Sequence, residues 1–211
     1  MFLKICGMTR LVDARLAIEH GATAIGFVLW PQSPRFVSNR KVAEIVAALP
    51  ASVMTVGVFV NQPPEEITMT MEQTGLTTAQ LHGDEPAVYA RALRSSPWSI
   101  WKSVTLERAD DAFATWPAET TFLLDAADPV RRGGTGQVVD WTQAAALARR
   151  RNVVLAGGLT PDNVGDAIVA VHPFGVDVSS GVEDAPGLKN AKKVTRFLAN
   201  ARKAEQYVQS A

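Results

Sequence analysis

The sequence has only one cysteine, Cys6, in 211 residues, so no disulfide can form within the chain. It also lacks an excess of either charge: Lys plus Arg and Asp plus Glu number 21 each, which argues against a basic surface for nucleic acid. No apolar run approaches the roughly 18 residues of a membrane-spanning helix, and the charged Lys4 comes too early for a signal peptide. The three histidines, His20, His82 and His172, are far apart and lack the spacing of metal ligands. We therefore expect a cytoplasmic protein with no metal and no nucleic acid or membrane partner.

What the sequence does contain is a repeated alternation of short apolar runs with amphipathic stretches, and 47% of its residues are hydrophobic. The apolar runs predict strands that recur roughly every 20–30 residues, which is the spacing of a β/α unit. The expected strands are residues 2–6, 23–29, 53–60, 77–81, 98–104, 121–125, 152–156 and 175–178. Eight such units without a linker predict an α/β fold, a single (β/α)8 TIM barrel over residues 1–211. A doubly wound open sheet is the alternative fold.

Helix signals lie between the expected strands. Thr9 suits the N-cap of a helix that Gly21 ends. Thr160 suits a second N-cap, with Pro161 at the first helical position, where its missing N–H costs little. The last and longest apolar stripe predicts the final helix and consists of Leu188, Ala191, Val194, Leu198 and Ala201.

Two turns of small residues follow the last two expected strands. The first contains Gly157 and Gly158, and the second contains Ser180 and Gly181. Such turns supply free backbone N–H groups and hydroxyls, which favour a phosphate dianion. In an eight-fold barrel the loops after strands seven and eight are the usual phosphate site. Ordinary barrel turns are the alternative, but two in succession at this place favour phosphate.

The longest irregular stretch is residues 126–140, which includes Gly133, Gly134 and Gly136 beside Arg131 and Arg132. A loop this long in a compact domain is more often functional than idle. Because it follows a strand at the catalytic face, we interpret it as a lid over the substrate. A solvated surface loop is the alternative.

The ends of the strands that flank the expected phosphate site carry a thiol and a carboxyl group, Cys6 and Asp125. This pair suits a base and an acid that act on one small molecule. As a base Cys6 must be a thiolate, which requires that its pKa fall from about 8.5, whereas Asp125 must stay protonated until it donates. Taken alone, Cys6 would be a buried core residue, and only its place opposite Asp125 favours catalysis.

Four further side chains are candidates at the same face. Arg35 could hold a carboxylate in a bidentate pair, with a solvated loop arginine as the alternative. Lys4 lies two residues before Cys6, points into the barrel and needs a partner, for which Asp177 on the eighth strand is the candidate. His82 follows the fourth strand as either a substrate contact or a satisfied strand-end histidine.

These residues stand in sequence blocks that resemble the phosphoribosylanthranilate isomerase family. The blocks are Lys4-Ile-Cys-Gly-Met-Thr9, Gly26 to Ser38 with its Ser33-Pro-Arg-Phe36, Val56-Gly-Val-Phe-Val-Asn61, Gln80-Leu-His-Gly-Asp84, Leu124-Asp125, Gly133-Gly-Thr-Gly136 with Asp140-Trp141, Leu155 to Val164, Asp177-Val-Ser-Ser-Gly-Val-Glu183 and Pro186-Gly-Leu-Lys189. They run in order over nearly the whole chain. The first block and the one that ends at Glu183 are highly specific together.

The resemblance implies an Amadori rearrangement of N-(5-phosphoribosyl)anthranilate to 1-(2-carboxyphenylamino)-1-deoxyribulose 5-phosphate, in tryptophan biosynthesis and without a cofactor. By the family's pattern Asp125 is the general acid that opens the ribose ring, and Cys6 is the general base that takes the C2′ proton. Arg35 matches the arginine that holds the anthranilate carboxylate. The partner expected is thus a small phosphosugar, and the chain is expected to be a monomer or a homodimer.

The sequence departs from the family in two places within the expected lid, at Val138-Val139 and at Pro129-Val-Arg-Arg132. A related isomerase of the histidine pathway uses two aspartates, and the thiol of Cys6 argues against it. Two other functions stay open. A lyase or synthase of the indoleglycerol phosphate type would need a catalytic lysine, for which Lys102 is the nearest candidate. A phosphosugar-binding sensor without activity would have no need to keep Cys6, Asp125 and Arg35.

Overall fold

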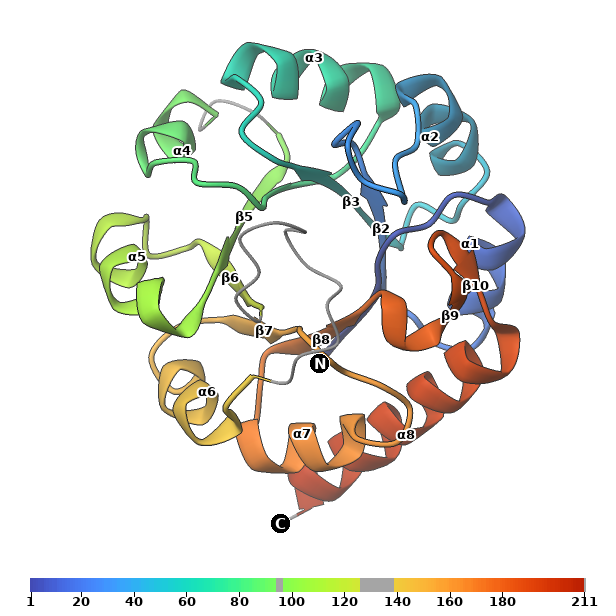
Figure 1. The fold of residues 1–211 in the computed structure, drawn as a ribbon, viewed down its shortest axis with the longest axis vertical. Coiled ribbons are helices and arrows are strands. Elements are labelled where there is room, and N and C mark those ends of the chain that lie inside the picture. Colours follow the sequence, from blue (N-terminus) through green and yellow to red (C-terminus); the bar gives the residue numbers. More distant parts are fainter. Residues whose placement is uncertain (94–96, 126–138, 211) are drawn as a thin grey trace.

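The computed structural model describes residues 1–93, 97–125 and 139–210, in which eight parallel strands form a closed barrel (Figure 1). The strands are β1 Phe2–Ile5, β2 Ala24–Val28, β3 Met54–Phe59, β4 Thr78–Leu81, β5 Ser99–Val104, β6 Thr121–Leu124, β7 Val153–Leu155 and β8 Gly175–Val178. All eight expected strands are present, and no bound differs from the predicted one by more than one residue.

The barrel closes between its first and last strands. β1 pairs with β2 on one side and with β8 on the other, in a parallel register that sets Phe2 beside Gly175 and Lys4 beside Asp177. A closed sheet of this kind has no free edge along the strands. The closure confirms the predicted barrel and excludes the doubly wound open sheet.

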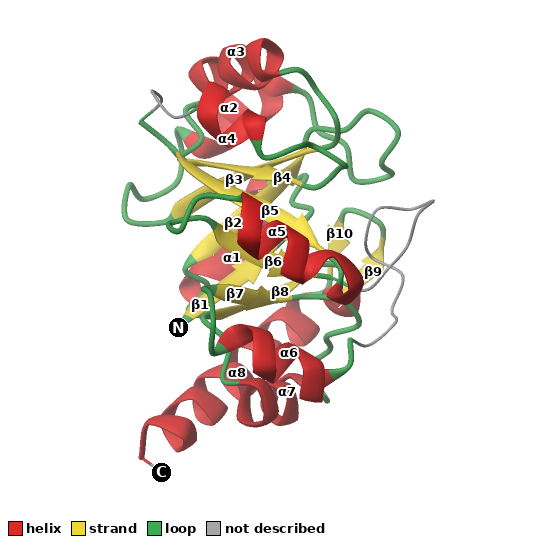
Figure 2. Ribbon diagram, turned by 90° about the vertical axis from the view of Figure 1, so that its left-hand side faces the viewer, coloured by secondary structure: helices red, strands yellow, loops and turns green. Residues whose placement is uncertain are grey.

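Helices surround the barrel, and Figure 2 shows α8 extending past its end. They are α1 Leu11–Glu19, α2 Asn39–Val46, α3 Pro64–Thr74, α4 Val88–Ala92, α5 Ala109–Thr115, α6 Trp141–Ala148, α7 Val164–Val171 and α8 Ala191–Ser210, with 3₁₀ turns η1 Leu106–Arg108 and η2 Ser180–Val182. A small antiparallel hairpin, β9 Glu183–Ala185 with β10 Leu188–Lys189, precedes α8. In the described part of the chain, no helix combines the length and the apolar character that crossing a membrane requires.

Three expected helix positions were wrong. Thr9 does not cap α1, because its hydroxyl donates to the carbonyl of Gly187 at 2.6 Å and the helix begins at Leu11. Thr160 accepts a hydrogen bond from the amide of Asp162, but in a turn that precedes α7, so Pro161 is not the first helical residue and the helix begins at Val164. Leu188 lies in β10, so the last stripe enters its helix only at Ala191. In each case the chain makes a tertiary contact or turn just before the helix, which a local capping pattern does not reveal.

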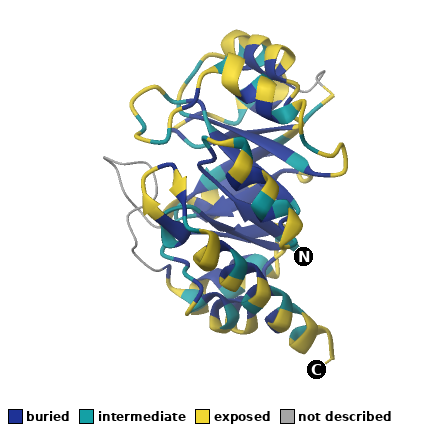
Figure 3. Ribbon diagram, turned by 90° about the vertical axis from the view of Figure 1, so that its right-hand side faces the viewer, coloured by how far each residue is buried: buried dark blue, intermediate teal, exposed yellow. Residues whose placement is uncertain are grey.

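The apolar core has two parts. The larger part fills the space between the barrel and the helices, whose outer faces are exposed (Figure 3). A smaller cluster of Trp101, Leu123, Val154 and Ala156 is separate from it. These residues alternate along β5, β6 and β7 with residues of the outer core, so they point into the barrel. The interior is thus packed by side chains and is not a channel.

One charged pair is buried inside this barrel. Lys4 has no exposed surface, and its Nζ atom lies 2.9 Å from Oδ2 of Asp177, as the sequence predicted. Burial by itself lowers the pKa of Lys4, but the charges of Asp177 and Cys6 raise it above its ordinary value. Gly26 leaves room for the lysine, since a Cβ atom there would lie 3.0 Å from its Cε. The pair ties β1 to β8 at the seam of the barrel.

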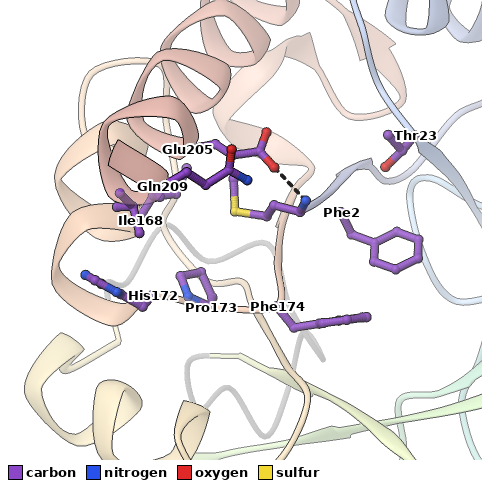
Figure 4. Close-up of a pocket in the computed structure, with 10 residues that line it drawn as sticks. Phe2, Thr23, Ile168, His172, Pro173, Phe174, Glu205 and Gln209 are labelled. Carbon is purple, nitrogen blue, oxygen red and sulfur yellow. Dashed lines mark hydrogen bonds and ion pairs between the residues drawn. The ribbon is translucent and has the colours of Figure 1, made fainter. Parts of the chain in front are cut away.

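A cavity of about 500 Å³ opens at the end of the barrel where the strands begin (Figure 4). Phe2, Phe174, Ile168 and Pro173 line it, and the amino group of Met1 pairs with Glu205 at its rim, at 2.6 Å. Because Phe2 begins β1 and Phe174 precedes β8, this cavity faces the N-terminal ends of the strands. Barrel enzymes keep their chemistry at the opposite face.

Loss of one partner of the Lys4–Asp177 pair should destabilise the protein strongly. Lys4→Met leaves a buried carboxylate without its counter-charge, so the free energy of unfolding should fall by roughly 3–5 kcal/mol. Urea unfolding followed by circular dichroism measures this change. The control is Lys41→Met, because Lys41 pairs with Glu44 on the exposed surface and such a pair contributes about 0–1 kcal/mol. Equal effects of the two substitutions would contradict the assigned role of the buried pair.

Candidate active site

The strand ends bring the predicted side chains to one face of the barrel. Cys6 follows β1, Asp125 follows β6, and Ser179 follows β8. All eight strands are parallel, so these C-terminal ends meet on the same side. The arrangement comes from the strand order alone, before any side-chain contact is considered.

Cys6 is buried beside the Lys4–Asp177 pair. Its amide donates to the carbonyl of Val178 at 2.8 Å, which continues the β1–β8 pairing past the end of the strand. A Cβ atom on Gly26 would lie 2.8 Å from the Sγ atom, so a larger residue there would displace the thiol. Burial raises the pKa of the Cys6 thiol, and the lowering effects of Lys4 and Lys189 do not offset it. The sequence argument required a lowered pKa, so the free protein differs from that expectation.

Asp125 lies against His82, which comes from the end of the fourth strand. The Nε2 atom of His82 is 3.4 Å from Oδ2 of Asp125 and 3.5 Å from the hydroxyl of Ser103. Its Nδ1 atom is 2.8 Å from the amide nitrogen of Gln80. With the amide nitrogen of Gln80 as the donor, Nδ1 accepts and Nε2 carries the hydrogen toward Asp125. Sequence reasoning did not foresee Gln80, whose place two residues before His82 on the same face was the available signal.

A cavity of about 460 Å³ adjoins this part of the site, and His82, Ser103 and Asp125 lie in its wall. Lys102 also lines it, but its ammonium group contacts the carbonyls of Leu81 and Gly83 and the carboxylate of Glu85, at 3.3, 2.7 and 2.8 Å. These three acceptors use the three donors of a lysine. Lys102 is therefore fixed in a structural role, which weighs against the lysine-dependent lyase or synthase.

Arg35 is held in an ion pair, unlike the solvated loop arginine that the sequence left open. Its Nε atom lies 3.0 and 3.1 Å from the two carboxylate oxygens of Glu183, and its Nη2 atom lies 2.7 Å from Oε2. Gly7 has φ 74° and lies under this side chain, where a Cβ atom would be 2.7 Å from Cδ of Arg35 and 2.9 Å from the hydroxyl of Ser179. The loops after β1, β2 and β8 thus meet around the guanidinium.

Glu183 was not among the residues chosen from the sequence, although it ends one of the blocks that carried the resemblance. It accepts from Nζ of Lys189 at 2.8 Å and from the amide of Gly187 at 3.1 Å. Burial by itself raises the pKa of Glu183, but the hydrogen bonds and charges of Arg35 and Lys189 lower it overall. The contact with Lys189 crosses the β9–β10 hairpin, which pairs the two residues in register.

The two predicted phosphate turns contact each other. Gly157 and Gly158 both have positive φ, 75° and 64°, so each adopts a conformation that glycine tolerates best. A Cβ atom on Gly181 would overlap the carbonyl of Leu159, so the second turn approaches the first at the backbone. Among the described residues, the buried hydroxyl of Ser179 has no hydrogen-bond partner. A polar atom of this kind beside two glycine-rich turns suits an anionic group.

Gly134 and residues 126–138 of the expected lid lie outside the described residues. Within the described ranges, no three His, Cys, Asp or Glu side chains gather in a group that could hold a metal ion.

Known proteins resemble this chain over nearly its whole length. The sequence model of the family described as N-(5′-phosphoribosyl)anthranilate (PRA) isomerase matches residues 3–200. The N-(5′-phosphoribosyl)anthranilate isomerase of Pelobacter propionicus is 43% identical over an alignment of 208 positions, which covers 95% of this chain and 95% of that one.

Solved structures show the same similarity. The phosphoribosyl anthranilate isomerase of Thermus thermophilus superposes with a TM-score of 0.87 at 41% identity, over 96% of this chain and 99% of that one. A phosphoribosyl anthranilate isomerase in complex with reduced 1-(o-carboxyphenylamino)-1-deoxyribulose 5-phosphate superposes with a TM-score of 0.84 at 38% identity, over the same shares of the two chains. The chain therefore belongs to the N-(5′-phosphoribosyl)anthranilate isomerase family.

Proposed function

We propose that the chain catalyses the rearrangement of N-(5-phosphoribosyl)anthranilate to 1-(2-carboxyphenylamino)-1-deoxyribulose 5-phosphate, with Asp125 as general acid and Cys6 as general base. The main support for these roles is that Asp125, Cys6 and the two predicted phosphate turns all lie at one end of the barrel. An acid and a base on opposite sides of one phosphosugar site are what this proton transfer requires.

The reaction then proceeds in two proton transfers. Asp125 gives its proton to the ring oxygen of the ribose, the ring opens, and an iminium ion forms at C1′. Cys6 as thiolate takes the proton from C2′, which gives an enolamine that tautomerises to the ketone. His82, held by Gln80 through Nδ1, fixes the carboxyl group of Asp125 in place.

The raised pKa of Cys6 in the free protein is compatible with this role. A positive charge within about 4–6 Å lowers the pKa of an acid, and the iminium ion brings such a charge next to the thiol at the step that needs the thiolate. The thiol then loses its proton to solvent, and the resulting thiolate acts as the base once the intermediate has formed. Lys4 and Lys189 already lower the pKa of Cys6 in part, so the added charge completes an effect that the protein begins.

The remaining groups bind the substrate. The phosphate interacts with the backbone N–H groups of Gly157, Gly158, Ser180 and Gly181, where the positive end of the 3₁₀ turn η2 adds to the attraction. Arg35 holds the carboxylate of the anthranilate ring. The ion pair of Lys4 and Asp177 supports the site from inside the barrel.

Other parts of the proposal concern the molecule as a whole. The chain forms one domain over residues 1–211, acts in the cytoplasm in tryptophan biosynthesis, and is a monomer or a homodimer.

Turnover of freshly generated N-(5-phosphoribosyl)anthranilate, followed by the loss of its fluorescence, tests the reaction and the acid together. We expect activity in the parent protein and a loss of about 10²–10⁴-fold in kcat for Asp125→Asn, since an amide cannot donate the proton. Asp111→Asn is the control, because Asp111 lies in the wall of the same cavity but outside the strand ends. A folded parent without activity would contradict the reaction, and an active Asp125→Asn variant would contradict the acid.

Cys6→Ser should lower kcat by about 10²-fold or more with little change in the free energy of unfolding. The hydroxyl fits the space of the thiol, but it is a far weaker acid, so the anionic base is almost absent. Steady-state kinetics and urea unfolding of the same preparation measure the two effects. A near-normal kcat would remove Cys6 from the mechanism.

The pH dependence of alkylation reports the state of Cys6 directly, since it is the only cysteine in the sequence. Only the thiolate reacts with iodoacetamide, so the rate rises with pH through the pKa of the thiol. Burial raises that pKa, so the midpoint in the native protein should lie above that of the same protein in urea, which titrates near the ordinary value of about 8.5. A native midpoint equal to or below the urea value would contradict the raised pKa.

A further inference from the structure

The ion pair between Arg35 and Glu183 uses one defined edge of the guanidinium. The carboxylate contacts Nε and Nη2, at 2.7 to 3.1 Å, which is the side-on arrangement. A guanidinium has five N–H donors in a planar fork. Two of them serve Glu183, so both hydrogens of Nη1 and the second hydrogen of Nη2 remain. One hydrogen of Nη1 and the second hydrogen of Nη2 form the other, end-on edge, while the remaining hydrogen of Nη1 points back toward Cδ. No described hydrogen bond uses Nη1.

Glu183 is itself held from three directions. Nζ of Lys189, the amide of Gly187 and the guanidinium all contact its carboxylate, and its side chain is 4% exposed. Lys189 also donates to the carbonyl of Ser179 at 3.2 Å, which ties the hairpin to the phosphate turn after β8. A carboxylate fixed in this way fixes the plane of the arginine that it binds.

The net charge of the cluster formed by Arg35, Lys189 and Glu183 also affects which ligand suits the site. Arg35 and Lys189 contribute two positive charges and Glu183 one negative charge, so the cluster carries one net positive charge. A single carboxylate at the end-on edge of Arg35 neutralises it. A ligand without a carboxylate would leave the positive charge partly buried and unpaired, which is costly.

We propose that Glu183 is the positioning residue that sets the selectivity of the site for a substrate with one carboxylate on its arylamine ring. It orients Arg35 through the side-on edge, so that the end-on edge faces the ligand in a fixed plane. The inference rests on the proposed role of Arg35 in binding that carboxylate, and it adds a residue that does not touch the substrate.

A pair of ligands separates this role from a general structural one. The first is reduced 1-(2-carboxyphenylamino)-1-deoxyribulose 5-phosphate, and the second is the same compound with a phenyl ring in place of the carboxyphenyl ring. Isothermal titration calorimetry gives the dissociation constant of the phenyl compound divided by that of the carboxyphenyl compound. This ratio measures what the carboxylate contributes to affinity. Glu183→Asp keeps the negative charge beside Lys189 but withdraws it from Arg35 by one methylene group.

We expect this ratio to fall about tenfold or more in Glu183→Asp, which is the value of one charge-assisted hydrogen bond, while the affinity for the phenyl compound stays unchanged. Glu183→Gln, which keeps the shape and removes the charge, should show the same loss. The matched control is Asp184→Asn, because Asp184 is the adjacent residue but contacts Asn190 and Lys193 on the exposed surface. Its ratio should equal that of the parent.

Two results would overturn the inference. An unchanged ratio in both Glu183 variants would show that Arg35 needs no positioning, and an equal loss of affinity for both ligands would show a structural role only. Arg35→Ala distinguishes these from a failure of the proposed function. If that variant keeps the parent ratio, the carboxylate is held elsewhere; if it loses the ratio while Glu183→Asp keeps it, only the role of Glu183 is wrong.

Discussion

The parallel pairing of β1 with β8 is the interaction on which the candidate site depends. It joins residues more than 170 positions apart and sets Lys4 beside Asp177. The amide of Cys6 then continues the same ladder by donating to Val178. Without this pairing the thiol would have no fixed place relative to the phosphate turns, because those turns belong to the last strands and the thiol to the first. The closure of the barrel therefore also assembles the site.

The fold could be predicted because its signals are local and repeated. Each strand is a short apolar run, and eight such runs at the spacing of a β/α unit leave few architectures. The strand ends followed from the same pattern, which is why Cys6, Asp125 and Ser180 could be assigned to one face. The Lys4–Asp177 pair followed too, since a buried lysine must have a counter-charge and the neighbouring strand offered one. The family resemblance added chemical roles to this frame.

The contacts that were not predicted join loops, for which a sequence gives no register. Glu183 meets Arg35 from β9, in the hairpin that follows β8, across 148 positions in the chain. The β9–β10 hairpin that presents it has only three and two residues in its strands, too few for a pattern of alternation to appear. The start of α1 was misjudged for a similar reason, since the hydroxyl of Thr9 bonds to this same hairpin, at Gly187. Patterns of neighbouring residues fail here because residues far away in the sequence bind the same polar groups.

Burial explains why the resting thiol differs from the thiolate that catalysis requires. Lys4 and Lys189 both act on it, but each is paired with its own carboxylate, Asp177 or Glu183. Burial is the largest cause of the raised pKa of Cys6, and the lowering effects of Lys4 and Lys189 do not offset it, while the charge of Asp177 raises it further. A thiol kept protonated at rest is also a poor target for oxidation, which attacks the thiolate. In the proposed reaction the iminium intermediate brings a positive charge close to Cys6. A base that becomes effective in response to that charge stabilises the transition state of the proton transfer after ring opening more than it stabilises the bound substrate. Stabilisation of this kind raises the rate.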